Sequence, residues 1–148
     1  MDFTLYAVSN EKDNSSFKLV YCLRKEKKLN PLFLSIENII PKAIYCSRDT
    51  AGLIDSEGGI IVITNSVLKY PTDKIETTFL PFKEKAVKLA LCDSFVISLS
   101  QTGRVYKSEI QEKKPLNFSE VTEFSDQTVI DVSGNSYHCF IVLEDGRI

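Results

Sequence analysis

Tryptophan is absent from the 148-residue sequence, methionine and histidine each occur once, and none of the four cysteines belongs to a Cys-x-x-Cys pair. Without such a pair a zinc site lacks its usual local chelating unit, so we expect no metal ligands. The cysteines lie in apolar runs, where we expect their thiols to pack as small buried hydrophobic groups. With a single histidine, the sequence also has only one residue of the type most often used as a general base in acid–base or nucleophilic catalysis.

An excess of charge of either sign is also missing. The 18 Lys and Arg residues against 20 Asp and Glu residues give a formal net charge of −2. Proteins that grip nucleic acid through its phosphates usually carry a basic excess, so nucleic acid is not an expected direct ligand. No run approaches about 18 apolar residues, and the first residues do not form a secretory signal. We therefore expect a cytoplasmic or nuclear protein with no membrane partner.

The apolar runs that do occur are short. They are four to seven residues long, rich in Val, Ile, Phe and Tyr, and separated by Asn, Asp, Ser, Gly and Pro. This pattern is typical of strands joined by turns, and no amphipathic helix longer than about two turns is visible. The sequence therefore predicts an all-β protein. The clearest runs lie at 5–8, 17–23, 43–46, 60–63, 86–91, 95–99, 129–132 and 139–143.

These strands recur as a unit. Gly59 and Gly103 are separated by 44 residues, and Gly103 and Gly146 by 43, a spacing in the range of propeller blades. A tight turn between antiparallel strands needs a residue at positive φ, which glycine adopts without steric cost. We therefore predict positive φ at one or both of Gly103 and Gly146. The copies of the unit span 43–62, 86–106 and 129–148.

The third copy carries the most distinctive motif. It combines a strand, Ser133-Gly134 and His138, an apolar strand, and a hairpin with Asp145, Gly146 and an arginine. This order resembles the repeat of the regulator of chromosome condensation (RCC1-like) family. The resemblance covers residues 40–148 well and residues 1–39 loosely. The resemblance implies four-stranded propeller blades, usually seven to a ring. We expect one repeat-containing domain over 1–148, with about three blades of an incomplete β-propeller.

Aligning the copies defines structural repeat positions. Gly134 corresponds to Leu91 and Ser47 in the other two copies, and His138 corresponds to Phe95 and Ala51. The predicted strand at 5–8 resembles the strand that follows the hairpin glycine in the repeated unit. The positions that carry the repeat are Gly59, Gly103, Gly134, His138, Asp145 and Gly146.

Other propeller families fit the sequence less well. WD repeats need Trp-Asp pairs, which a chain without tryptophan cannot supply, and kelch repeats need a double glycine, which occurs only at Gly58-Gly59. A kelch-like scaffold propeller, a solenoid and a plain β-sandwich are kept as alternatives.

Catalytic chemistry would have to use His138. Neighbouring residues on a strand point to opposite faces, so Cys139 is badly placed as its nucleophile. We interpret His138 as packed in a seam between blades, and the hairpin carboxylates Asp55, Glu57, Glu144 and Asp145 as solvated. We therefore expect no catalytic residues, no cofactor and no enzyme, with a small hydrolase or redox enzyme built on His138 as the alternative.

The expected function is that of a non-enzymatic protein–protein interaction or regulatory module. The resemblance implies guanine nucleotide exchange on a small GTPase as one specific form. Two basic groups could meet phosphate or an acidic partner surface, although solvated loops are the simpler interpretation. They are Arg24, Lys25, Lys27 and Lys28, and Lys83, Lys85 and Lys88 with Lys113 and Lys114.

The two ends of the repeat array would leave open blade faces. We expect either that further blades complete the propeller or that copies associate head to tail. In the second case residues 3–8 would pair beside residues 138–143 of a neighbour, because such pairing satisfies edge backbone groups.

Overall fold

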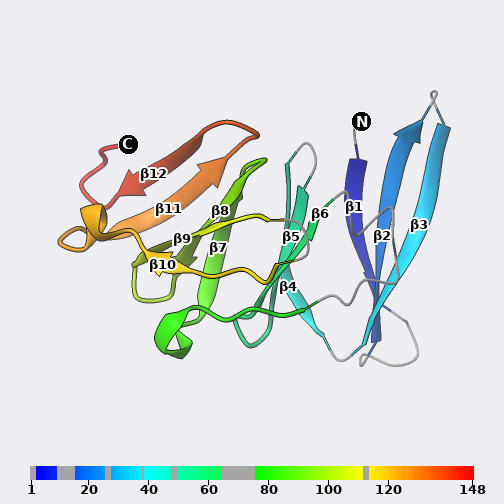
Figure 1. The fold of residues 1–148 in the computed structure, drawn as a ribbon, viewed down its shortest axis with the longest axis horizontal. Helices are drawn as coiled ribbons and strands as arrows, with labels where there is room; N and C mark the ends of the chain where they lie inside the picture. The colour runs from blue at the N-terminus through cyan, green and yellow to red at the C-terminus, as the bar shows by residue number, and fades with distance from the viewer. Residues whose placement is uncertain are drawn as a thin grey trace.

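The computed structural model describes residues 3–9, 16–25, 28–37, 39–47, 50–64, 76–111 and 114–148, with side chains described from residue 39 onward. In this part of the chain, strands form four antiparallel sheets that stand side by side in chain order (Figure 1). No helix of the described residues is long and apolar enough to cross a membrane. The predicted all-β class is confirmed.

Each sheet is a meander of consecutive strands. The first contains β1 (Phe3–Ser9), β2 (Ser16–Lys25) and β3 (Lys28–Glu37), and the second contains β4 (Pro41–Cys46), β5 (Thr50–Asp55) and β6 (Ile60–Thr64). The third is a full four-stranded blade of β7 (Ala86–Leu91), β8 (Phe95–Ser100), β9 (Val105–Glu109) and β10 (Ser119–Glu120). The fourth pairs β11 (Val129–Gly134) with β12 (Cys139–Leu143), and the short 3-10 turns η1 (Pro81–Lys83) and η2 (Thr122–Phe124) precede β7 and β11.

The repeat is visible in the backbone hydrogen bonds of three hairpins. At 55–59, 100–104 and 143–147, the first residue donates to the carbonyl of the last at 2.9 Å. The fourth residue of each hairpin is a glycine at positive φ: Gly58 (83°), Gly103 (80°) and Gly146 (85°). The prediction for Gly103 and Gly146 is confirmed. Gly59 was the wrong glycine, because the equivalent of Gly103 is Gly58 and the true spacing is 45 residues.

A second set of turns corrects the alignment of the first copy. Cys92 donates to the carbonyl of Phe95 and Asn135 to that of His138, both at 2.9 Å, and Ser47 donates to Thr50 at 2.8 Å. His138 therefore corresponds to Thr50 and not to Ala51. By the same register Gly134 corresponds to Cys46 and not to Ser47. The error arose because the first copy lacks both landmark residues, so nothing in its sequence fixed the register.

The N-terminal strand has a different place from the one predicted. A third blade strand would be followed by one more strand before the next blade, but β2 and β3 both lie between β1 and β4. A four-residue apolar run identifies a strand and does not identify its position within a blade.

The described core includes two seams between neighbouring sheets. Val96 and Tyr106 of the third sheet pack against Ile54 of the second, while Ile97 and Leu99 pack against Val132 of the fourth. Alternate residues of β8 thus enter opposite seams, as strand geometry requires. The blades are held together by apolar burial on both faces of the central sheet.

The cysteines whose side chains are described differ in their exposure to solvent. Cys92 is buried, Cys139 is half-buried and Cys46 is exposed, so the prediction of a buried thiol is wrong for Cys46. Burial, together with nearby Cys139 and Asp93, raises the pKa of Cys92 to about 11. Its thiol is therefore protonated at neutral pH and is a poor nucleophile. The side chain of Cys22 lies outside the described residues.

Candidate functional site

His138 does not provide a catalytic base in a cleft. Its side chain is exposed, which corrects the expectation that it packs in a seam. Only its backbone lies in the seam, where its carbonyl oxygen accepts a hydrogen bond from the Cys92 thiol at 3.7 Å. Its backbone N–H donates a hydrogen bond to Oδ1 of Asn135 at 3.0 Å, so the residue closes a turn. The hydrolase or redox alternative gains no support from this geometry.

The hairpin carboxylates behave in two ways. Glu57, Glu144 and Asp145 are exposed, as expected, and Asp145 pairs with Arg147 at 2.7 Å. Asp55 was also expected to be solvated, but it is buried. Its Oδ1 accepts the backbone N–H groups of Glu57 at 2.9 Å and Gly59 at 2.7 Å, which explains its burial in the turn. Asp55 is therefore a structural acceptor.

The other repeat positions lie apart. Gly134 ends β11, where a Cβ would stand 3.2 Å from the Ala90 side chain and from the His138 carbonyl. This close approach explains why a residue without a side chain suits the position. Gly103 and Gly146 lie in separate hairpins, so the repeat positions do not converge on one site.

The basic groups are also separated. Lys88 forms an ion pair with Asp131 across a seam at 2.7 Å, and Lys114 is exposed beside the loop after β9. Lys83 and Lys85 are exposed near η1. The side chains of Arg24, Lys25, Lys27, Lys28 and Lys113 lie outside the described residues.

The feature that the sequence analysis missed is the turn at 81–84. Glu84 N–H donates to the Pro81 carbonyl at 3.2 Å, and the two residues between them, Phe82 and Lys83, have φ of 56° and 57°. Positive φ at both central positions defines a type I′ turn, which strongly favours Asn and Gly. A phenylalanine and a lysine each cost about 1–2 kcal/mol there. Phe82 gains no burial in return, because 88% of it is exposed.

Phe82 and two other exposed apolar residues lie on segments that hydrogen-bond to or pack against the 55–59 hairpin. Ile40 is 50% exposed and its carbonyl accepts the Ser56 N–H at 2.9 Å, while Phe79 is 51% exposed and lies against Gly59. The turn is joined to the same hairpin, because Ala86 N–H donates to the Gly58 carbonyl at 3.2 Å. We call this surface the 55–59 face; it consists of Ile40, Phe79 and Phe82 with the exposed Lys42, Lys83 and Lys85.

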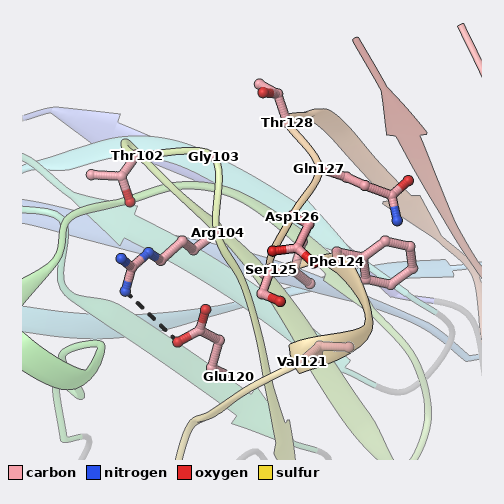
Figure 2. A pocket seen from close by; sticks show the side chains of 11 residues that line it. Thr102, Gly103, Arg104, Glu120, Val121, Phe124, Ser125, Asp126, Gln127 and Thr128 are labelled. Atoms are coloured by element: carbon pink, nitrogen blue, oxygen red, sulfur yellow. Dashed lines mark ion pairs between the residues drawn. The ribbon is translucent and has the colours of Figure 1, made fainter. Parts of the chain in front are cut away.

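A polar basin lies beside this face. It has a volume of about 300 Å³ and is bounded by the 100–104 hairpin, β10 and the segment after η2. Figure 2 shows Arg104 pointing toward Glu120, and their charged atoms are 3.8 Å apart. Arg104 is also 3.8 Å from Glu84, so its charge is offset by two carboxylates. The basin therefore has no unbalanced positive charge to attract an anion.

Glu84 links the basin to the 55–59 face. Its carboxylate accepts the Thr102 hydroxyl at 2.6 Å, and Thr102 is bonded in turn to the Ser100 hydroxyl at 2.9 Å. Burial alone would raise the pKa of Glu84, but these hydroxyl groups and Arg104 lower it below its usual value. The network fixes the end of the 81–84 turn to the β8–β9 hairpin.

The chemistry of these residues suits docking better than catalysis. Among the described residues no group of three or more His, Cys, Asp or Glu side chains could hold a metal ion. Exposed apolar side chains rimmed by polar residues are typical of surfaces that bind another macromolecule. The sequence signal was Pro81-Phe82-Lys83, an aromatic residue in a turn between two predicted strands.

Comparison with known proteins adds information on the fold. No protein-family model and no curated protein sequence matches the chain. Among solved structures, it is similar to human WBSCR16, with a TM-score of 0.64 and 15% identity over 97% of this chain and 44% of that chain. It is also similar to yeast RCC1 (Prp20) bound to Kap60, with a TM-score of 0.64 and 13% identity over 97% of this chain and 40% of that chain.

A third similar structure is Prp20p from Saccharomyces cerevisiae, described with its binding properties to Gsp1p and histones. The TM-score is 0.54 and the identity 15%, over 88% of this chain and 39% of that chain. The chain thus spans less than half the length of these structures. The shared architecture agrees with the three repeated hairpins and the face-to-face sheets. The chain therefore has the β-propeller blade fold of these RCC1-like structures.

Proposed function

We propose that this chain is a protein-interaction module and that the 55–59 face is its docking surface. The observation that carries the proposal is Phe82, which is 88% exposed in a backbone conformation that phenylalanine disfavours. Strained backbone concentrates at sites where function maintains it against stability. The proposal takes residues 1–148 as one repeat-containing domain with a non-enzymatic role in the cytoplasm or nucleus.

Burial in a complex would explain the arrangement. Aromatic side chains, phenylalanine included, are enriched in interfaces, and interface hot spots cluster in well-packed, desolvated pockets. The surrounding apolar area of Ile40 and Phe79 would exclude water from such a contact. The hydrogen bonds from the 55–59 and 100–104 hairpins hold the turn in place, so little ordering would be needed on binding.

An unbiased peptide library displayed on phage tests this function without knowledge of the partner. We expect enriched peptides that bind the chain and whose binding is lost in Phe82→Asn. Phe140→Ser is the matched control, because Phe140 is also an exposed aromatic but lies on β12, away from the 55–59 face. Absence of enriched peptides, or equal loss in both variants, would contradict the proposal.

Guanine nucleotide exchange on a small GTPase is the finer form of this function that the resemblance suggests. Its support is the fold shared with Prp20p, which is described with binding to Gsp1p. Release of a fluorescent guanine nucleotide from purified small GTPases, with and without the chain, tests it directly. Acceleration that disappears in Phe82→Asn would assign exchange to the 55–59 face.

Completion of the propeller stays a prediction. Among the described strands β12 pairs only with β11, and β1 pairs only with β2. Further blades or a second copy would cover these edges. Light scattering over a concentration series would distinguish a self-associating chain from a monomer.

A further inference from the structure

The charges next to Phe82 are arranged asymmetrically. Lys83 and Lys85 are exposed, whereas Glu84 between them turns toward the β8–β9 hairpin. Its carboxylate accepts a hydrogen bond from the Thr102 hydroxyl at 2.6 Å and forms an ion pair with Arg104 at 3.8 Å. Two exposed lysines therefore follow Phe82 in the chain, and the carboxylate between them is turned toward the β8–β9 hairpin.

The rest of the 55–59 face carries charges of both signs. Lys42 adds a third exposed ammonium group, while Glu57 and Glu76 are exposed carboxylates near the hairpin among the described residues. The exposed charges between Phe82 and Ala86 are both positive, in a protein whose formal net charge is −2. Long polyanions would be repelled by the whole molecule, whereas a short acidic segment would feel mainly the nearest charges.

We propose that the 55–59 face binds an acidic segment of another protein that carries an apolar side chain. The apolar side chain would lie against Phe82 and Phe79, and carboxylates on either side of it would lie beside Lys83 and Lys85. This inference rests on the proposed function and adds the chemical class of the partner. Complementary charge sets the orientation and the association rate, while the buried ring supplies most of the affinity.

The other concave regions are weaker candidates for the same partner. The basin beside Arg104 contains compensating carboxylates. The basin of about 440 Å³ that holds Lys107 and Lys114 also contains Glu109, and it has no exposed apolar anchor among its described lining residues. Of these three regions, as far as the structure describes them, the 55–59 face alone combines exposed apolar side chains with exposed lysines close in the chain.

The test uses two synthetic peptides of equal length, each with a central Phe-Leu pair. In one the flanking residues are Glu and Asp, and in the other they are Lys. Titration into the isotope-labelled chain, followed by NMR, should show shifts at residues 79–85 and 56–59 with the acidic peptide only. The affinity should fall with added salt, as expected for exposed charges.

Charge reversal provides the matched variants. Lys83→Glu/Lys85→Glu should weaken binding of the acidic peptide by about tenfold or more, because two attractive contacts become repulsive. Lys107→Glu/Lys114→Glu makes the same charge change on another exposed surface and should alter the affinity less than about twofold. Spectra of both variants without peptide report whether the fold is retained.

Several outcomes would overturn the inference. One is equal or tighter binding of the lysine peptide, and another is insensitivity to Lys83→Glu/Lys85→Glu. Tighter binding of single-stranded DNA or anionic vesicles at the same residues would also overturn it. If library peptides require Phe82 but ignore the two lysines, the proposed function survives and the acidic partner does not. If nothing requires Phe82, both proposals fail.

Discussion

The 55–59 and 143–147 hairpins have the same backbone and different surroundings. Both close with the same hydrogen bonds and place a glycine near φ 84°, at Gly58 and Gly146. A Cβ on Gly58 would stand 2.7 Å from the Lys85 Cβ and 2.8 Å from its Cα, whereas a Cβ on Gly146 would meet nothing within 4 Å. The repeat therefore specifies the turn, and the packing of neighbouring segments gives one copy a distinct surface.

The glycines give the largest expected difference. Gly58→Ala combines the cost of positive φ with a clash against backbone, and should lower the free energy of unfolding by about 3 kcal/mol or more. Gly146→Ala has only the conformational cost and should lower it by about 1 kcal/mol. Urea denaturation of the two variants measures both values. Equal losses would show that packing does not distinguish the hairpins.

The carboxylates give the next difference. Asp55→Ala removes a buried acceptor from two backbone N–H groups and should destabilise the chain by about 2–3 kcal/mol. Asp145→Ala removes an exposed ion pair with Arg147 and an exposed acceptor of the Arg147 backbone N–H at 3.2 Å, so its unfolding midpoint should change much less than that of Asp55→Ala. A larger loss at Asp145 would reverse the assignment of which hairpin is tightly packed.

Acid titration tests the network that holds the 81–84 turn. The pKa of Glu84 is lowered in the folded chain, so ionised Glu84 stabilises the fold above its unfolded pKa. This stability is lost as the pH falls from about 4.3 through the folded pKa. Glu84→Gln should therefore be less stable than the wild type at neutral pH, and the difference should shrink in acid. A difference that is constant with pH would contradict the network.

The smallest effect is expected at His138. Since its ring is exposed and its backbone makes the turn, His138→Gln should change the free energy of unfolding by less than about 0.5 kcal/mol. If the ring were packed in a seam, as the sequence predicts, the same substitution would lower the free energy of unfolding markedly. A cooperative thermal melt of the variant decides between the two, and a marked drop in midpoint would restore the seam position.

The sequence predicted the repeated elements well where local signals were strong. Apolar runs of the right length gave β7, β8, β11 and β12, and Gly103 and Gly146 gave the hairpins. It failed at Gly59, because either glycine of a Gly-Gly pair could occupy the turn. It also failed at Asp55, since burial of a hairpin carboxylate depends on segments distant in sequence, such as 77–79.

The candidate site was harder to predict for a related reason. Phe82 looks like an ordinary apolar residue, and its exposure follows only from the 81–84 turn and the way Leu80 and Ala86 enter the seam on either side. The local sequence at this turn opposes the conformation it adopts, and such conflicts are expected at functional positions.

Phe82→Asn tests this conflict most directly. Asparagine tolerates positive φ far better than phenylalanine, and the lost ring was exposed, so the free energy of unfolding should rise by about 0.5–1 kcal/mol. The same variant should lose binding of the library peptides and of the acidic peptide. Greater stability with lost binding is the result that the account predicts. Lower stability with unchanged binding would show that Phe82 serves the fold, and would contradict the assignment of the 55–59 face as a docking surface.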